Sequence, residues 1–211
     1  MPKRILFGFI ILCSCACHLV GDMDNYNGCG LEGDAKREDV RELNTHKNKY
    51  DFPDSAQIDR SITLQAMLAP GNDRDRFSMG KAAEITGYVN DVKVGGDESC
   101  NCHARRPEDR DTHIELVVSP EQSAEGTRVI VEVTPRLREE MAKKGVDWST
   151  DNLRNKIKGH YVKVRGWLLF DEEHIKQAEN TDPDNPKDWR ATCWEIHPVT
   201  SIELLTNALL P

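Results

Sequence analysis

The sequence predicts a mostly β domain, a small closed barrel that carries a helical insert. Three observations predict it. Five segments show the apolar patterning of strands, and two helical segments stand together between the third and the fourth of them. Gly87 and Gly166 interrupt the first and fourth strands, where a small barrel must bend. Three strands, a helical insert and two more strands is the chain order of the OB-fold, a five-stranded Greek-key barrel. An unrelated small β-barrel or sandwich with a helical insertion is the alternative.

The first three expected strands precede the insert. Residues 82–94 (AAEITGYVNDVKV) alternate between apolar and polar types, and a loop rich in Gly, Asp and Arg follows at 95–110. Residues 111–119 and 127–135 are the second and third strands. Pro135 ends the third, because proline cannot donate a hydrogen bond to a sheet.

The insert and the last two strands complete a barrel domain that spans residues 81–211. Ser149 or Thr150 is expected to cap the second helix, and Gly145 and Gly159 suit the helix ends. The expected elements are helices at 136–145 and 149–159 and strands at 160–171 and 190–204 (RATCWEIHPVTSIEL).

Alternation along each strand separates an apolar face from a polar one. The apolar face would fill the barrel, with Ile114, Val131, Val164 and Ile196 at its centre. In the fifth strand the same parity places Val199 on the polar face. That face would form an outer surface, and Asp171 and His174 would extend it at one barrel end. Its other members are Asp111, His113, Glu132, Lys163, Arg165, Trp167, Glu195 and His197.

Three interpretations of this polar surface are open. The first is a solvated face with charge pairs across the strands. The second is a stacking platform for a nucleic-acid strand or a sugar, in which Tyr161, Lys163, Arg165 and Trp167 take part. The net charge of −8 makes nucleic acid a poor partner. The third is a metal or acid–base cluster, although the chain has no H-E-x-x-H spacing. It would use His113, His174 and His197 to hold zinc or another divalent ion, near Asp111 and Glu195.

The first residues predict export. Lys3 and Arg4 precede an apolar run that is shorter than the about 20 residues of a membrane-spanning helix. Leu12-Cys13-Ser14-Cys15 resembles the bacterial lipoprotein box, which implies a lipid on Cys15, with Cys17 as the alternative. Residues 1–17 would then be the signal and lipidation region of a protein anchored to a membrane of the bacterial cell envelope. A plain signal peptide or an uncleaved anchor is the other interpretation.

Residues 18–80 are polar and without clear periodicity, which predicts a flexible tether. Within it, residues 59–71 (DRSITLQAMLAPG) are expected to form a short helix that ends at Pro70-Gly71.

Four cysteines lie beyond the signal, and an exported protein is expected to pair them as disulfides. A bridge from Cys193 to Cys100 or Cys102 is the expected pairing. The alternatives are free thiols or a zinc site that combines Cys100, Cys102 and His103 with Cys193.

Four segments together resemble a group of uncharacterised exported bacterial proteins. The segments are DTHIELVV, RVIVEVTP, VRGWLLFDEEH and WEIHPVTSIEL, and the resemblance covers residues 81–204. It implies that the polar residues recur as a set, and it brings no assigned activity. The matching positions are Asp111, His113, Glu132, Gly166, Phe170, Asp171, His174, Glu195, His197 and Pro198.

Two functional hypotheses follow. The first is a binding or structural module, a lipid-anchored barrel that recognises an envelope ligand or a partner protein. The second is a metal-assisted hydrolase of phosphoesters or similar bonds, with the three histidines as ligands and Asp111, Glu132 or Glu195 as ligand or general base. The sequence contains no Gly-x-Ser-x-Gly elbow, phosphate loop or dinucleotide fingerprint.

Overall fold

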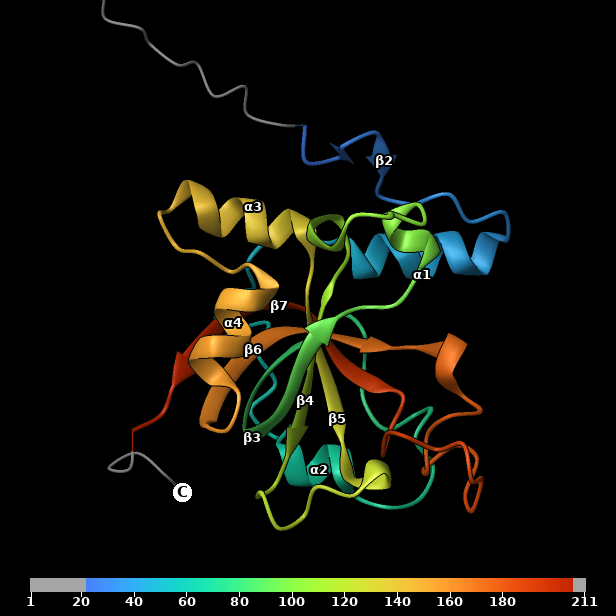
Figure 1. The fold of residues 1–211 in the computed structure, drawn as a ribbon. Coiled ribbons are helices and arrows are strands. Elements are labelled where there is room, and N and C mark those ends of the chain that lie inside the picture. The colour runs from blue at the N-terminus through green and yellow to red at the C-terminus, as the bar shows by residue number, and fades with distance from the viewer. Residues whose placement is uncertain (1–21, 207–211) are drawn as a thin grey trace, which may run out of the picture.

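A computed structural model describes residues 22–206 and contains a closed five-stranded barrel, which confirms the mostly β prediction. The strands follow one another around the barrel in the order β3-β4-β5-β7-β6 (Figure 1). All neighbours are antiparallel except β5 and β7, which are parallel. The strands are β3 (Ala82–Val94), β4 (Thr112–Val117), β5 (Val129–Val133), β6 (Tyr161–Phe170) and β7 (Trp194–Leu204).

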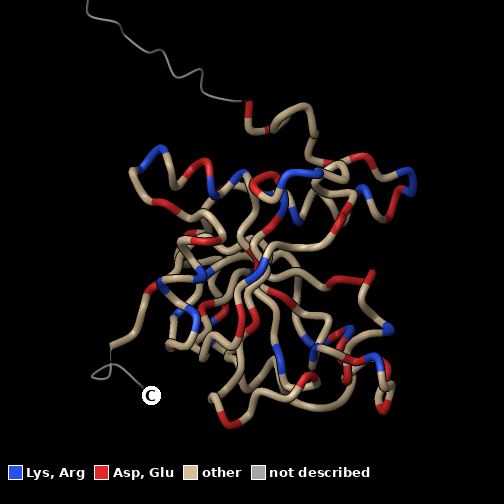
Figure 2. The backbone as a smooth tube through the Cα atoms, viewed as in Figure 1, with Lys and Arg blue, Asp and Glu red and all other residues tan. Residues whose placement is uncertain are grey.

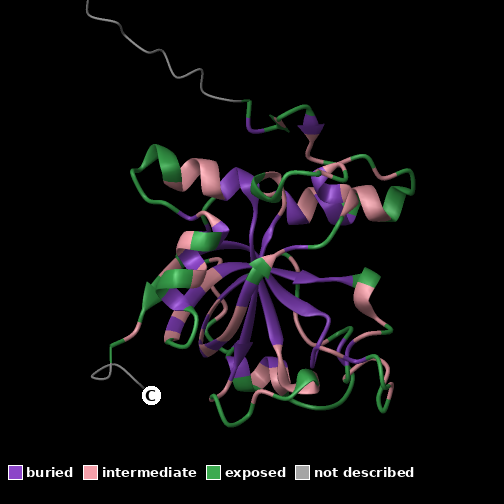
Figure 3. Ribbon diagram, viewed as in Figure 1, coloured by how far each residue is buried: buried purple, intermediate pink, exposed green. Residues whose placement is uncertain are grey.

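The barrel interior is the expected one. Ile114, Val131, Val164 and Ile196 are all fully buried, and Figure 3 shows buried ribbon along most of β4, β5, β6 and β7. The prediction for Val199 is wrong, because Val199 is buried in the same core as Ile196. Val199 pairs with Gly166 and Ile196 pairs with Leu168, so two residues of β7 lie opposite one residue of β6. This bulge shifts the side-chain parity by one position.

Two helices form the insert between β5 and β6, as expected. They are α3 (Pro135–Lys143) and α4 (Thr150–Ile157). Thr134 is the N-cap of α3, and its hydroxyl accepts a hydrogen bond from Leu137 N at 3.3 Å. In α4, Leu153 and Ile157 pack into the barrel core.

The segment before the barrel is not a free tether. Residues 22–80 contain β1 (Asn25–Tyr26), β2 (Cys29–Gly30), α1 (Glu38–Lys47) and α2 (Leu64–Leu68). α1 and α3 lie across one end of the barrel, and α2 lies at the opposite end (Figure 1). Leu64 and Met67 of α2 belong to the barrel core, so apolar burial fixes this segment in place. The expected short helix is confirmed as α2.

Short 3₁₀ turns complete the connections: η1 (Ser99–Asn101), η2 (Pro107–Asp109), η3 (Glu125–Thr127) and η4 (Glu172–His174). Acidic and basic residues are interleaved along α1 and α3 (Figure 2). Within residues 22–206, no helix has the length and apolar character needed to cross a bilayer. The expected signal region and the candidate lipidation sites Cys15 and Cys17 lie outside the described residues.

The expected disulfide is wrong. Cys29 pairs with Cys102 across a Cα–Cα distance of 5.8 Å, and Cys100 and Cys193 are free and buried. Cys193 packs inside the barrel core, away from solvent, where a thiol serves as a small apolar group. Cys29 could not be identified as the partner, because it lies in the segment predicted to be a tether.

Candidate functional site

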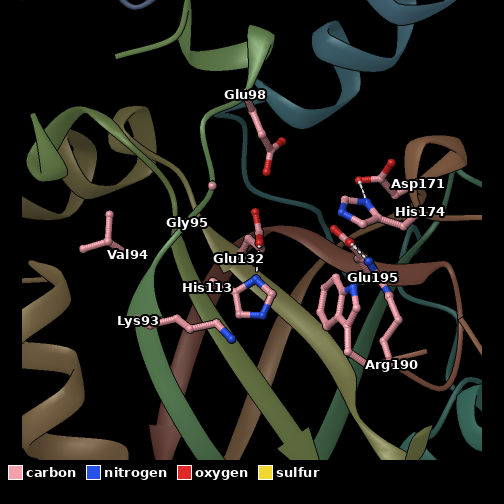
Figure 4. A pocket seen from close by; sticks show the side chains of 12 residues that line it. Lys93, Val94, Gly95, Glu98, His113, Glu132, Asp171, His174, Arg190 and Glu195 are labelled. Atoms are coloured by element: carbon pink, nitrogen blue, oxygen red, sulfur yellow. Dashed lines mark hydrogen bonds and ion pairs between the residues drawn. The ribbon is translucent and has the colours of Figure 1, made fainter. Parts of the chain in front are cut away.

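A cavity of about 220 Å³ opens beside the barrel, next to the loop that leads from β3 toward η1. Ionisable side chains from several strands and loops reach into it, and Figure 4 shows Glu98 and Glu132 pointing toward one another from opposite sides. Its lining residues are Lys93, Val94, Gly95, Gly96, Glu98, His113, Glu132, Asp171, His174, Trp189, Arg190 and Glu195.

His113 and Glu132 form the first buried pair of the site. They are direct cross-strand partners of β4 and β5, so the sheet register sets their contact. His113 Nδ1 lies 2.8 Å from Glu132 Oε1, a hydrogen bond in which the imidazole donates. His113 Nε2 makes no hydrogen bond among the described residues, and the ring centroid of Trp189 is 5.6 Å from that of His113. The carboxylate therefore orients an imidazole whose second nitrogen is free.

His197 lies among three carboxylates. Its Nδ1 is 3.2 Å from Glu195 Oε2 and 3.4 Å from Glu132 Oε2, and its Nε2 is 3.9 Å from Asp111 Oδ2. Burial alone would lower the pKa of His197, but the hydrogen bond to Glu195 and the other carboxylates raise it to about 9. Burial is the main cause that raises the pKa of Asp111 to about 6.

Arg190 neutralises Glu195 inside the protein. Its Nη1 donates to Glu195 Oε1 at 2.6 Å, and its Nε donates to Thr192 O at 2.7 Å. Burial acts to raise the pKa of Glu195, but the Arg190 guanidinium and His197 lower it to about 2. Glu195 is therefore a carboxylate at neutral pH.

Lys47 of α1 neutralises Asp171, as Arg190 neutralises Glu195. Its Nζ lies 2.9 Å from Asp171 Oδ2 and 2.8 Å from Glu98 Oε2, and only 1% of its side chain is exposed. Asp171 Oδ2 also lies 3.1 Å from His174 Nδ1. Burial opposes ionisation of Asp171, yet Lys47 and His174 hold the pKa of its carboxyl well below the usual range.

A pH-dependent stability is expected from His174. Burial acts to lower the pKa of His174, but Asp171 raises it overall, with Arg190 opposing and Glu195 assisting. A raised folded-state pKa contributes stability that is complete below the unfolded value of about 6.5 and is lost as the pH rises through the folded value. In urea unfolding, the free-energy difference between the native chain and His174→Gln should be largest below a pH of about 6.5 and should shrink as the pH rises above it. A difference that stays constant would contradict the Asp171–His174 interaction.

The structure brings together most of the residues that the sequence singled out. These form the carboxylate–histidine cluster, which consists of Asp111, His113, Glu132, Asp171, His174, Glu195 and His197. The prediction that they share an exposed outer surface is wrong, because segments outside the barrel, such as the loops after β3 and β6, cover them. All of them except His174 are buried.

Three predicted residues of β6 do not belong to this cluster. Lys163 pairs with Glu203 at 2.7 Å, and Arg165 Nε donates to Glu84 at 2.9 Å. Trp167 Nε1 donates to Asp51 O at 3.0 Å, and Lys49 covers its ring. His197 and His174 fall in two separate groups of candidate metal ligands, Asp111–Glu132–His197 and Asp171–His174–Glu195, and His113 belongs to neither. The structure therefore does not bring the three histidines together as ligands of one ion.

Sequence reasoning missed Lys47, Glu98 and Arg190 as site residues. It considered Cys100 only for a disulfide or for a zinc site with Cys102, His103 and Cys193. Arg190 lies just before the last strand and a few positions before its partner Glu195. A search of that segment for opposite charges close in sequence could have found it. Lys47 lies in a polar helix with no signal of burial.

Carboxylates outnumber fixed cations in the site. Lys47 and Arg190 offset two of the acidic groups, His197 with its pKa of about 9 offsets a third, and Lys93 is engaged by Glu115 at 2.7 Å. The remaining acidic groups and free imidazole nitrogens can accept a cation or orient a general base. No protein-family model matches the chain, and a search of curated proteins finds no significant match.

Proposed function

We propose that the protein is a binding module of the bacterial cell envelope that captures a small cation in the carboxylate–histidine cluster. The observation that carries the proposal is the cavity of about 220 Å³, lined by Glu98, Glu132, Asp171 and Glu195 but by few free cations. Buried carboxylates favour a positive partner, because an unpaired charge in the interior is costly. The volume is below the roughly 300–1,000 Å³ of pockets for drug-sized ligands, which favours a metal ion or a small amine.

An OB-like barrel and a lipid anchor are parts of the same proposal. The chain order of three strands, two helices and two strands supports the OB-like assignment, as does the parallel contact of β5 with β7. The lipoprotein-box resemblance at Cys15 supports the anchor. The Cys29–Cys102 disulfide is typical of an exported protein.

Binding of putrescine, agmatine and Zn²⁺ to the full-length chain, measured by calorimetry, tests the proposal. At least one of these cations should bind, and Glu132→Gln should weaken it about tenfold or more, a loss of about 1.4 kcal/mol. The matched control is Glu84→Gln, because Glu84 pairs with Arg165 outside the cluster. No binding of any of the three cations, or an equal loss in the two variants, would refute the proposal.

A metal-assisted hydrolase is the second candidate, and the His113–Glu132 pair favours it. A carboxylate that holds Nδ1 leaves Nε2 of His113 available as a general base beside candidate metal ligands. Hydrolysis of bis-p-nitrophenyl phosphate with added Zn²⁺, Mn²⁺ or Mg²⁺ should then be lost in His113→Ala. It should persist in His160→Ala, because His160 is exposed before β6. No hydrolysis above the metal-only blank would remove this candidate.

A further inference from the structure

We propose that Cys100, Asp111 and His197 form a binding site for a divalent ion of the zinc class, with Glu132 in reach as a further ligand. The inference rests on the proposed function and names the cation that the cluster takes. It adds a thiol from η1 to the residues already described.

Asp111 joins two groups of candidate ligands into one site. Glu98, Cys100 and Asp111 form one group, and Asp111, Glu132 and His197 form the other, with ligand atoms within 4.8 Å of one another in each. Asp111 Oδ2 lies 3.8 Å from Cys100 Sγ and 3.9 Å from His197 Nε2. Ligand atoms around tetrahedral zinc are about 3.5 Å apart, given Zn–N and Zn–S bonds of about 2.0 and 2.3 Å. Asp111 Oδ2 is therefore close to this spacing from both Cys100 Sγ and His197 Nε2.

Two polar atoms at this point are buried without a hydrogen bond. They are His197 Nε2 and Asp111 Oδ1, on residues that are 1% and 2% exposed. An unsatisfied buried polar group costs about 1–3 kcal/mol. An ion bound to His197 Nε2 would satisfy that atom, and coordination by both oxygens of Asp111 would also satisfy Oδ1.

Neighbouring groups already hold the proposed ligands in place. Glu195 lies 3.2 Å from His197 Nδ1, which leaves Nε2 free to face Asp111. Asn101 donates to Asp111 Oδ2 at 2.8 Å. Carboxylates and amides that orient ligand side chains in this way are typical of metal sites.

The other candidate group, Asp171–His174–Glu195, is less suited to an ion. Lys47 lies 2.9 Å from Asp171 and Arg190 lies 2.6 Å from Glu195, so both carboxylates already have a cation. A metal there would be repelled by the two side chains. Asp111 has no Lys or Arg partner within salt-bridge distance among the described residues, so its charge is available.

The ligand types indicate the class of ion. A thiolate, an imidazole and carboxylates together favour zinc and similar transition ions over Mg²⁺ or Ca²⁺, which prefer oxygen ligands alone. On binding, the Cys100 thiol and a protonated His197 each release a proton to solvent, and their S and Nε2 atoms each donate an electron pair to the ion.

Cobalt substitution of the full-length chain tests the inference with its disulfide intact. After metal removal, added Co²⁺ should produce a thiolate-to-cobalt charge-transfer band in the near ultraviolet, and Zn²⁺ should abolish it. Cys100→Ser should lose the band that the native chain shows. Cys193→Ser is the matched control and should retain it, because Cys193 is also free and buried but lies in the barrel core.

A second readout does not depend on the thiol variant. Saturating Zn²⁺ should raise the urea midpoint of the native chain, because an ion that binds only the folded state stabilises it, and the rise should be lost in His197→Gln. Absence of the charge-transfer band in the native chain, or its equal presence in Cys100→Ser, would overturn the inference. If putrescine or agmatine binds and Zn²⁺ and Co²⁺ do not, the proposed function stands and this inference fails.

Discussion

Gly166→Ala is expected to destabilise the protein by at least about 3 kcal/mol, the upper end for overpacking of a protein interior. A Cβ atom at Gly166 would collide with Pro198 O and would lie 2.6 Å from Ile196 Cγ2 and 2.9 Å from Val199 Cα. Two of these contacts are with backbone, which cannot move aside as a flexible side chain can. The collision falls at the bulge where β6 pairs with β7, so relief of it would separate the two strands. Urea unfolding followed by circular dichroism measures the loss.

Gly80→Ala is the matched control for this substitution. Gly80 is exposed, and the nearest atom to its added Cβ would be Ser78 Oγ at 3.8 Å, an ordinary contact. Its effect should stay within about 0.5 kcal/mol. If Gly166→Ala were equally mild, the close approach of β6 to β7 would not be essential for the barrel.

Lys47→Met should cost about 3–5 kcal/mol, the range for removal of one partner from a buried ion pair. Methionine nearly preserves the volume but leaves Asp171 and Glu98 without the ammonium that lies 2.9 and 2.8 Å from them. Addition of Asp171→Asn should recover part of the loss, because the amide carries no charge to be left unpaired. The free energy of unfolding of the two variants and the double variant gives the comparison.

Lys163→Met is the control for the charge pair. Lys163 lies 2.7 Å from Glu203, but the two side chains are 36% and 49% exposed, so the pair contributes less than about 1 kcal/mol. If Lys47→Met and Lys163→Met lowered the free energy of unfolding by similarly small amounts, burial would not strengthen the ion pairs of Lys47.

The strands of the barrel could be predicted because their apolar residues alternate. Residues 82–94 were expected to form a strand and do so over that whole range as β3. Ile114 and Val131 are buried as the alternation requires. The alternation rule assumes that strand pairing has no bulge. β7 has a bulge opposite Trp167, so the rule predicted the wrong face for Val199.

The composition of the candidate site could be predicted only in part. Alternation correctly placed His113 and Glu132 away from the barrel interior, but it carries no information about which loops cover that face. α1 covers it with Lys47, and two of the other buried positions nearby are Asn44 and Asn48, so a helix that is buried through polar groups shows no apolar stripe. Cys29 was missed for a related reason, since spacing does not determine disulfide connectivity.

Lys47 also determines how the molecule opens. One ammonium joins α1 to the loop after β3 and to the end of β6, three segments far apart in the chain. If α1 moved away from the barrel, Glu98 and Asp171 would be left without the ammonium of Lys47. α1 therefore belongs to the same cooperative unit as the barrel. Amide hydrogens in the middle of α1 should consequently exchange with solvent as slowly as those of the central strands.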